Sequence, residues 1–116
     1  MPLYRCTTPV GALDDEARTA IAKTITEIHC DVTGAPPTFV HVQFLDGDEP
    51  AIHGGIRAGR DDEQTERLVR RCVDEVGAIA GLEFSMRTSA TRASWIFEGG
   101  RVFPEPGDEA GWLEHG

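Results

Sequence analysis

The sequence predicts an α+β fold in which two fused strand–helix–strand units form a four-stranded sheet with two helices on one face. A strand pattern, a long amphipathic helix pattern and a second strand pattern occur in that order, and the same order then repeats. Strands joined through a helix pair in parallel. We expect the 116 residues to form one domain, with units at residues 2–47 and 51–88 and a C-terminal hairpin and tail at residues 94–116.

The first unit begins with a short strand at residues 2–8, which ends before Pro9. Asp14 or Asp15 is a suitable N-cap for the helix that follows, and Gly34 is a suitable residue to end it. Residues 39–45 read as the second strand. Apolar side chains recur along the helix at spacings of three and four, at Ala17, Ile21, Ile25, Ile28 and Val32.

The second unit repeats this order. Residues 51–56 predict a strand, Asp61 or Asp62 caps the next helix, Gly81 ends it, and residues 82–87 predict the fourth strand. A pseudo-two-fold relation between the units would make the third strand antiparallel to the first. The expected apolar face of this helix comprises Leu68, Val69, Cys72, Val73, Val76, Ile79 and Ala80.

The C-terminal region predicts a hairpin of residues 94–97 and 101–103 and a tail that packs on the protein through Trp112. Two helices on one side leave the other sheet face uncovered. We expect that face to contain Phe, Val and Leu, and therefore to be covered by the tail or by the bare sheet faces of other copies.

Composition excludes several function classes. A net charge of -9 argues against nucleic acid as a partner, and no apolar run suits a membrane span or a signal peptide. The unpaired spacing of Cys6, Cys30 and Cys72 predicts reduced, mostly buried thiols and a cytoplasmic protein. His41 and His53 belong to different strands, and no Cys/His spacing predicts a metal site.

Pro2 is the first candidate functional residue. If Met1 is removed, Pro2 becomes a secondary amine at the head of the first strand. An α-amino group titrates at about pH 8, so this amine can be tuned to act as a base, an acid or a nucleophile.

The lengths of the first two elements bring His29 back to Pro2. A strand from residue 2 to residue 8 covers about 20 Å, and a helix from residue 14 to residue 29 covers about 22 Å in return. A half-buried histidine, or one that caps carbonyl groups near the helix end, is the structural alternative.

Arg57 and Arg60 follow the third strand, whose end should lie beside Pro2 if that strand is antiparallel to the first. Two guanidinium groups at a helix N-terminus suit a carboxylate. The alternative is that they form surface ion pairs with Asp61, Asp62 and Glu63.

Together, Pro2, His29, the run Arg57-Ala58-Gly59-Arg60 and the tail from Gly100 to Trp112 resemble the tautomerase superfamily. Within it, the chain is most similar to the cis-3-chloroacrylic acid dehalogenase group, over nearly its whole length. The resemblance implies a tautomerase or MIF-like fold, a homotrimer, and no metal or organic cofactor.

The resemblance also implies roles for these residues. Pro2 works as the catalytic amine, and Arg57, Arg60 and His29 hold the carboxylate of a small substrate. Glu109 is the tail carboxylate that activates water, and Glu105 is the alternative.

Two further positions, Tyr4 and Gly99, bear on the reaction that the site can perform. Tyr4 is a candidate to contribute a hydroxyl to substrate binding. Gly99 stands where the dehalogenases carry a tyrosine that helps to orient water, which argues against efficient dehalogenation.

We therefore expect an enol–keto tautomerase or hydratase with broad specificity and at most weak cis-3-haloacrylate dehalogenase activity. Malonate-semialdehyde-type decarboxylation is another reaction that such a pocket suits. The alternative is a non-catalytic ligand-binding or assembly module on the same fold, and retention of Met1 would favour it because Pro2 would then be an amide.

Overall fold

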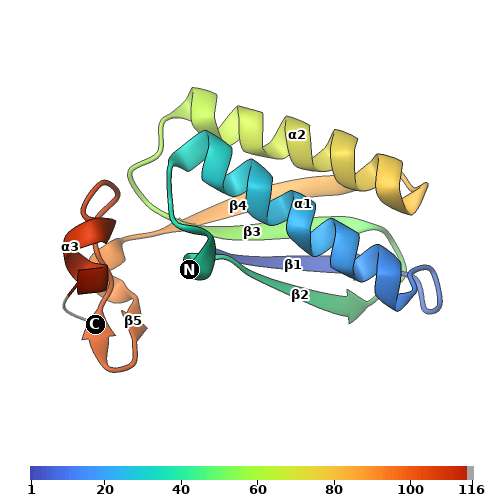
Figure 1. Cartoon of the computed structure of the whole chain (residues 1–116). Coiled ribbons are helices and arrows are strands. Elements are labelled where there is room, and N and C mark those ends of the chain that lie inside the picture. The colour runs from blue at the N-terminus through green and yellow to red at the C-terminus, as the bar shows by residue number, and fades with distance from the viewer. Residues whose placement is uncertain (115–116) are drawn as a thin grey trace.

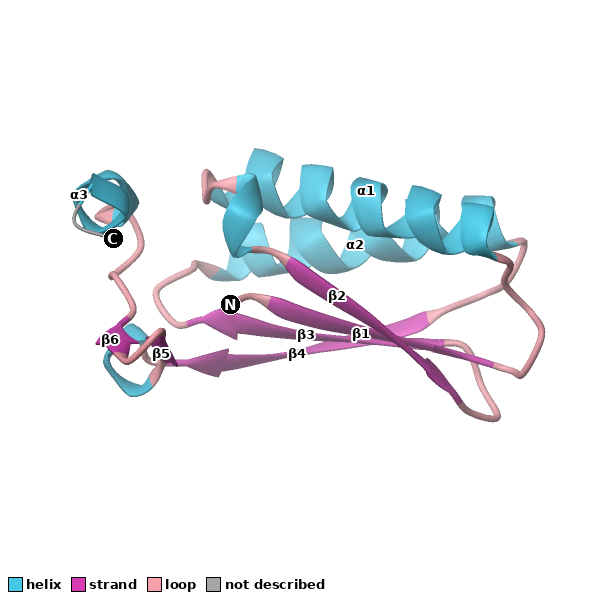
Figure 2. Cartoon of the chain, turned by 60° about the horizontal axis from the view of Figure 1, so that its bottom comes forward, coloured by secondary structure: helices cyan, strands magenta, loops and turns pink. Residues whose placement is uncertain are grey.

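The computed structural model describes residues 1–114 and contains a sheet with the strand order β2-β1-β3-β4. Strand β1 (Leu3–Thr8) pairs in parallel with β2 (His41–Asp46), and β3 (Ala51–Arg57) pairs in parallel with β4 (Ser85–Thr91). Strands β1 and β3 are antiparallel. Both long helices cover the same sheet face (Figures 1 and 2), so the predicted α+β fold is confirmed.

Helix α1 (Asp15–Thr33) begins and ends as predicted. The Asp14 carboxylate accepts a hydrogen bond of 2.8 Å from the Ala17 amide, a contact that stabilises a helix by about 1 kcal/mol. Gly34 ends the helix with φ of +76°. The side chains that face the sheet are buried, and they include Ile21, Ile25, Ile28 and Val32.

Helix α2 (Asp62–Ala80) begins with a capping box between Asp61 and Gln64 and ends at Gly81. Its buried side chains are Leu68, Cys72 and Val76. Ile79 was expected on the same face, but it is 38% exposed in the last turn. The helices and the two central strands together enclose the core, to which β1 contributes Tyr4 and Cys6 and β3 contributes Ile52 and Ile56.

All three cysteines are free thiols. Cys6 and Cys72 are buried in the core, as predicted, whereas Cys30 on α1 is partly exposed. Burial raises the pKa of Cys6 to about 11.

Two strand boundaries differ from the prediction. Strand β2 begins at His41 because residues Pro37–Phe39 form a 3-10 helix after Pro36. Strand β4 begins at Ser85, three residues later than predicted. The Leu82 amide still bonds to the Gly77 carbonyl at the end of α2, at 3.3 Å.

The C-terminal region forms a smaller hairpin than predicted, of β5 (Phe97–Glu98) and β6 (Arg101–Val102). A 3-10 helix at Ala93–Trp95 precedes it, and the short helix α3 (Glu109–Glu114) follows it. These elements lie beyond the end of the sheet, at the end that holds the N-terminus (Figures 1 and 2). As predicted, Trp112 packs on the protein, against Phe39 and Phe103.

The uncovered sheet face is not the apolar surface that we expected. Val42 and Phe44 of β2 pack against the core on the helix side, because side chains alternate between the two faces of a strand. The other positions of the sheet place Arg5, His53 and Arg87 on the bare face. The tail does not cover this face, because it lies beyond the sheet end (Figure 2).

Candidate active site

The N-terminus lies at the start of the central strand β1. Pro2 is fully buried, and its carbonyl accepts a 3.0 Å hydrogen bond from the His41 amide. In this chain the amino group belongs to Met1. Burial lowers the pKa of that amine and the charge of Arg57 lowers it further, whereas the carboxylate of Glu98 raises it. The N-terminus therefore lies within the electrostatic reach of a cation and an anion.

His29 meets β1 at Tyr4, two residues after Pro2. The Tyr4 hydroxyl lies 2.7 Å from His29 Nδ1, and the two rings form an edge-on contact with centroids 5.6 Å apart. His29 is 1% exposed and Tyr4 is completely buried. Tyr4 therefore directs its hydroxyl to His29, a contact that can position the histidine. The expectation that Tyr4 also binds substrate stays a prediction.

The charge state of both rings is set by their surroundings. Burial lowers the pKa of His29 to about 3, and the nearby charges of Arg60, Arg57 and the N-terminus act in the same direction. Burial likewise raises the pKa of Tyr4 far above its usual range. At neutral pH, therefore, Tyr4 keeps its proton and His29 is uncharged.

The direction of the hydrogen bond with Tyr4 decides the tautomer of His29. A neutral imidazole has one donor nitrogen and one acceptor nitrogen. If the Tyr4 hydroxyl donates to Nδ1, the proton of the ring is on Nε2. That Nε2 is buried and has no hydrogen-bond partner among residues 1–114. It is thus available to donate to a bound molecule.

Arg57 is at the end of β3 and is 2% exposed. One terminal nitrogen donates to the Pro104 carbonyl at 2.7 Å, and the other donates to Glu109 Oε1 at 2.9 Å. The guanidinium carbon lies 5.5 Å from the ring centroid of Phe39 and 5.4 Å from that of Phe103. Cation–π contacts and the ion pair therefore fix this cation and attach the tail to the sheet.

Arg60 is less constrained than Arg57. Its only hydrogen bond among the described residues is from Nη1 to the Thr33 carbonyl, at 3.3 Å, while its buried Nε has no partner there. Burial lowers the pKa of Arg60, and the neighbouring Arg57 charge lowers it further. The two arginines thus differ: Arg57 is engaged with the tail and Arg60 retains an unused donor. Neither forms an ion pair with Asp61, Asp62 or Glu63 within residues 1–114.

Of the two tail carboxylates, Glu109 is the one that reaches Arg57. Its second oxygen accepts a 2.9 Å hydrogen bond from the Gly107 amide. Burial alone raises the pKa of Glu109, but the hydrogen bonds from Arg57 and from backbone amides outweigh it and lower the pKa overall. Glu105 is exposed, and its side chain forms no hydrogen bond or ion pair within residues 1–114, whereas its backbone carbonyl accepts a hydrogen bond from the Asp108 amide.

Gly99 occupies the turn between β5 and β6. Its φ of +59° and that of +80° at Gly100 are both left-handed, which favours glycine at the two central positions of a tight hairpin turn. The position is exposed and a Cβ added there would meet no atom within 4 Å. The turn geometry therefore accounts for a glycine at the position where the dehalogenases carry tyrosine.

Sequence reasoning missed three neighbours of the site. Glu98 acts on the terminal amine, and the rings of Phe39 and Phe103 flank Arg57. The two phenylalanines had been assigned to strands. The run Pro36-Pro37 before Phe39 was the available signal that the chain turns there.

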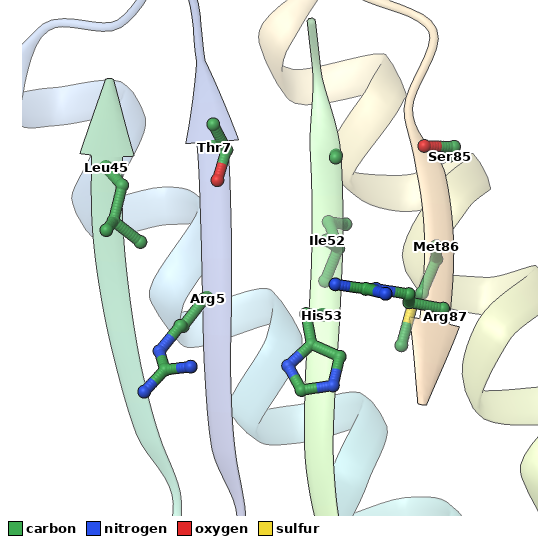
Figure 3. Close-up of a pocket in the computed structure, with 9 residues that line it drawn as sticks. Arg5, Thr7, Leu45, Ile52, His53, Ser85, Met86 and Arg87 are labelled. Atoms are coloured by element: carbon green, nitrogen blue, oxygen red, sulfur yellow. The ribbon is translucent and has the colours of Figure 1, made fainter. Parts of the chain in front are cut away.

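Within residues 1–114, the side chains include no cluster of three or more potential metal ligands. No helix in the same range combines the length and apolar character of a membrane span. The hollow in Figure 3 lies on the bare sheet face and is lined by none of the candidate site residues.

Comparison with known proteins gives the family. Residues 1–67 match the Tautomerase_3 family model, described as "Putative oxalocrotonate tautomerase enzyme". A search of curated proteins found no match. Among solved structures, N1, a member of the cis-3-chloroacrylic acid dehalogenase (cis-CaaD) family, is similar at 28% identity and a TM-score of 0.92, with 97% of this chain and 91% of that chain covered.

Two other solved structures share the fold. A wild-type fused 4-OT, solved as an asymmetric trimer, is 18% identical with a TM-score of 0.78, covering 87% of this chain and 95% of that chain. Malonate semialdehyde decarboxylase is 13% identical with a TM-score of 0.74, covering 87% and 94% respectively. Because the family model spans more than half of the sequence and the fold agrees throughout, the chain belongs to the tautomerase superfamily of enzymes, and its structure is close to that of the cis-3-chloroacrylic acid dehalogenase group.

Proposed function

We propose that the chain is a cofactor-free enzyme in which Pro2, freed by removal of Met1, moves a proton on a small unsaturated or 2-oxo carboxylate. The reactions are enol–keto tautomerisation and hydration of an activated double bond, with at most weak dehalogenation of cis-3-haloacrylates. The observation that carries this proposal is a pair of buried donors, His29 Nε2 and Arg60 Nε, without partners among residues 1–114.

A buried donor without a hydrogen-bond partner destabilises the protein by about 1–3 kcal/mol. Here one donor belongs to the Arg60 cation and the other to His29, so an anion is the ligand that these donors favour. In this assignment Arg60 and His29 Nε2 donate to the substrate carboxylate. Arg57 adds positive potential and holds Glu109, to which it already donates. The two oxygens of a carboxylate are acceptors of the kind that these two donors lack.

The terminal amine supplies the proton transfer in tautomerisation. Neutral Pro2 takes the hydroxyl proton of the enol and returns it to the adjacent carbon, where a C–H bond forms as the carbonyl forms. No proton is gained or lost overall. The lowered pKa of the present terminal amine, caused by burial and by Arg57, supports a neutral amine at this place.

Hydration uses the same residues with the proton on Pro2. Ionised Glu109 accepts a proton from water as the water oxygen bonds to the substrate carbon, and protonated Pro2 delivers its proton to the neighbouring carbon. The lowered pKa of Glu109 keeps that carboxylate ionised. With glycine at position 99, no tyrosine hydroxyl from that position helps to orient the water, which limits dehalogenation.

The assembly that we assign to this enzyme is a homotrimer, as in the fused 4-OT solved as a trimer. The partner is a small carboxylate. The net charge of -9 favours neither nucleic acid nor an anionic membrane surface as a further partner.

The test is a substrate screen by proton NMR on protein whose free Pro2 is verified by intact mass. Phenylenolpyruvate, propiolate-type acids and cis- and trans-3-haloacrylates cover the proposed reactions. Pro2→Ala and Arg60→Ala should each abolish turnover while size-exclusion chromatography shows the wild-type oligomer. Arg70→Ala, an exposed arginine of α2, is the matched control and should retain full activity.

Turnover that survives in Pro2→Ala contradicts the proposal. So does a wild-type protein that has a free Pro2, binds these acids and converts none of them. That second result would instead establish the non-catalytic binding module.

A further inference from the structure

The bare sheet face carries a row of basic side chains, in a hollow that none of the candidate active-site residues lines. Arg5 of β1 is directly opposite His53 of β3, and His53 is directly opposite Arg87 of β4. On the other side of β1, Arg5 is paired with Gln43. We call Arg5, His53 and Arg87 the basic row.

This arrangement is unusual for an acidic protein. The strand positions that alternate onto the bare face include no Asp or Glu. Within residues 1–114, neither Arg5 nor Arg87 forms an ion pair. Arg5 and Arg87 thus place two positive charges on one face, on either side of β3, without a carboxylate of residues 1–114 paired to either, and an anion from outside the protomer could neutralise them.

Among residues 1–114, the row makes two side-chain hydrogen bonds. Arg5 Nε is 3.4 Å from Gln43 Oε1, which is a long hydrogen bond, and His53 Nε2 is 3.1 Å from the Ser89 hydroxyl. Figure 3 shows the Arg87 guanidinium reaching across β3, close to His53. Arg5 and Arg87 thus flank the central histidine from both sides.

A hollow of about 370 Å³ lies along this row. That volume is at the small end of the range of ligand sites, about 300–1,000 Å³. Besides the basic row, two hydroxyl-bearing residues line it, Thr7 and Ser85, together with four apolar residues, Leu45, Ala51, Ile52 and Met86 (Figure 3). Guanidinium, imidazole and hydroxyl donors around one hollow are the groups that bind an oxyanion with several negative charges.

We propose that the basic row is a binding site for a small multivalent oxyanion, of the phosphate or polycarboxylate class. Arg5 and Arg87 each donate to its oxygens, with His53 between them. Copies of the chain that meet through their bare sheet faces would bring further basic rows together. The bound anion would then also neutralise the repulsion between those copies.

The experiment is isothermal titration calorimetry with inorganic phosphate and, separately, citrate, on the full chain dialysed into chloride buffer. Comparing the two affinities shows whether the site prefers a phosphate or a polycarboxylate. Arg5→Gln and Arg87→Gln should each weaken binding about tenfold, the effect of losing one charge-assisted hydrogen bond. Arg70→Gln, on the exposed face of α2, is the charge-matched control and should bind as the wild type does.

A second arm separates this site from the candidate active site, which also attracts anions. In the Arg60→Ala variant the binding that depends on Arg5 and Arg87 should persist. Binding that is lost in Arg60→Ala and unchanged in Arg5→Gln and Arg87→Gln overturns the proposal.

Thermal unfolding provides a readout that does not depend on calorimetry. Phosphate should raise the Tm of the wild type and of Arg70→Gln, but not that of an Arg5→Gln/Arg87→Gln double variant. In phosphate-free buffer the double variant should be at least as stable as the wild type, because like charges have been removed. Equal stabilisation of all three proteins by phosphate, or none in the wild type, overturns the proposal, because phosphate then does not act through Arg5 and Arg87.

Discussion

Tyr4→Phe removes one oxygen atom from the buried pair that orients His29. The phenylalanine keeps the edge-on ring contact at 5.6 Å but cannot donate to Nδ1, which now lies 2.7 Å from the tyrosine oxygen. His29 is 1% exposed, so water does not replace the lost partner. Leaving this nitrogen unsatisfied should destabilise the protein by about 1–3 kcal/mol.

The same change should weaken substrate binding. Without the tyrosine proton, nothing on Nδ1 holds the ring proton on Nε2, and the donor aimed at the substrate carboxylate is lost in part of the population. A loss of about 1.4 kcal/mol in binding raises KM about tenfold. The step at Pro2 does not involve Tyr4, so kcat should change less than KM.

Three measurements test this reasoning. Urea denaturation at fixed protein concentration gives the stability, steady-state kinetics give the KM and kcat, and ¹⁵N NMR of the imidazole shows which ring nitrogen carries the proton. A double-mutant cycle with His29→Gln should give a coupling energy of about 1 kcal/mol or more. The reasoning is refuted if Nδ1 is protonated in the wild type, or if Tyr4→Phe leaves both KM and the His29 nitrogen shifts unchanged.

Three further predictions concern other parts of the site. Since the pKa of His29 falls from 6.5 to about 3 on folding, the unfolded chain takes up a proton that the folded chain does not as pH drops through this window. The free energy of unfolding should therefore fall on acidification, by at most about 5 kcal/mol, and denaturation between pH 7 and pH 5 should show a smaller slope in His29→Gln. Glu109→Gln leaves the buried Arg57 guanidinium without its anion and should lower the free energy of unfolding, measured by chemical denaturation, by about 1–3 kcal/mol. Glu105→Gln, at an exposed position, should lower it by less than about 0.5 kcal/mol. Equal effects of the two changes would contradict the Arg57–Glu109 ion pair. Gly99→Ala places a side chain at φ of +59° and should lower the stability by about 1 kcal/mol in thermal unfolding. Gly111→Ala, in α3, is the control and should not lower it. Equal Tm values for the two variants would contradict the statement that the turn favours glycine at position 99.

The sequence predicts the fold well where local signals and burial agree. Helix α1 was predicted with its cap at Asp14 or Asp15 and its end at Gly34, and the structure has Asp14 and Gly34, because both ends are set by neighbouring residues. Strand β4 was misplaced because Ser85–Thr91 has little apolar periodicity. Its limits come from pairing with all seven residues of β3, which is information outside the segment.

The site shows the same division. The placement of His29 beside β1 follows from element lengths, and Arg57 follows from the antiparallel third strand. The tail carboxylate of the site could be narrowed only to Glu109 or Glu105, and its ion pair with Arg57 was not predicted, because the short helix α3 and the aromatic contacts of the tail decide both. The polar bare face was missed because the phase of β2 puts Val42 and Phe44 against the helices.

The way the tail is attached separates two kinds of change in this protein. The four strands and two long helices enclose their own core, and the C-terminal segment meets them through the ring contacts of Phe39 with Phe103 and Trp112 and through the bonds of Arg57. New sequences in the segment that carries Glu109 can therefore introduce a different acid, a different hydroxyl or none, while the strand register stays as it is. Changes of chemistry can therefore be made at the chain end without altering the scaffold that holds the terminal amine.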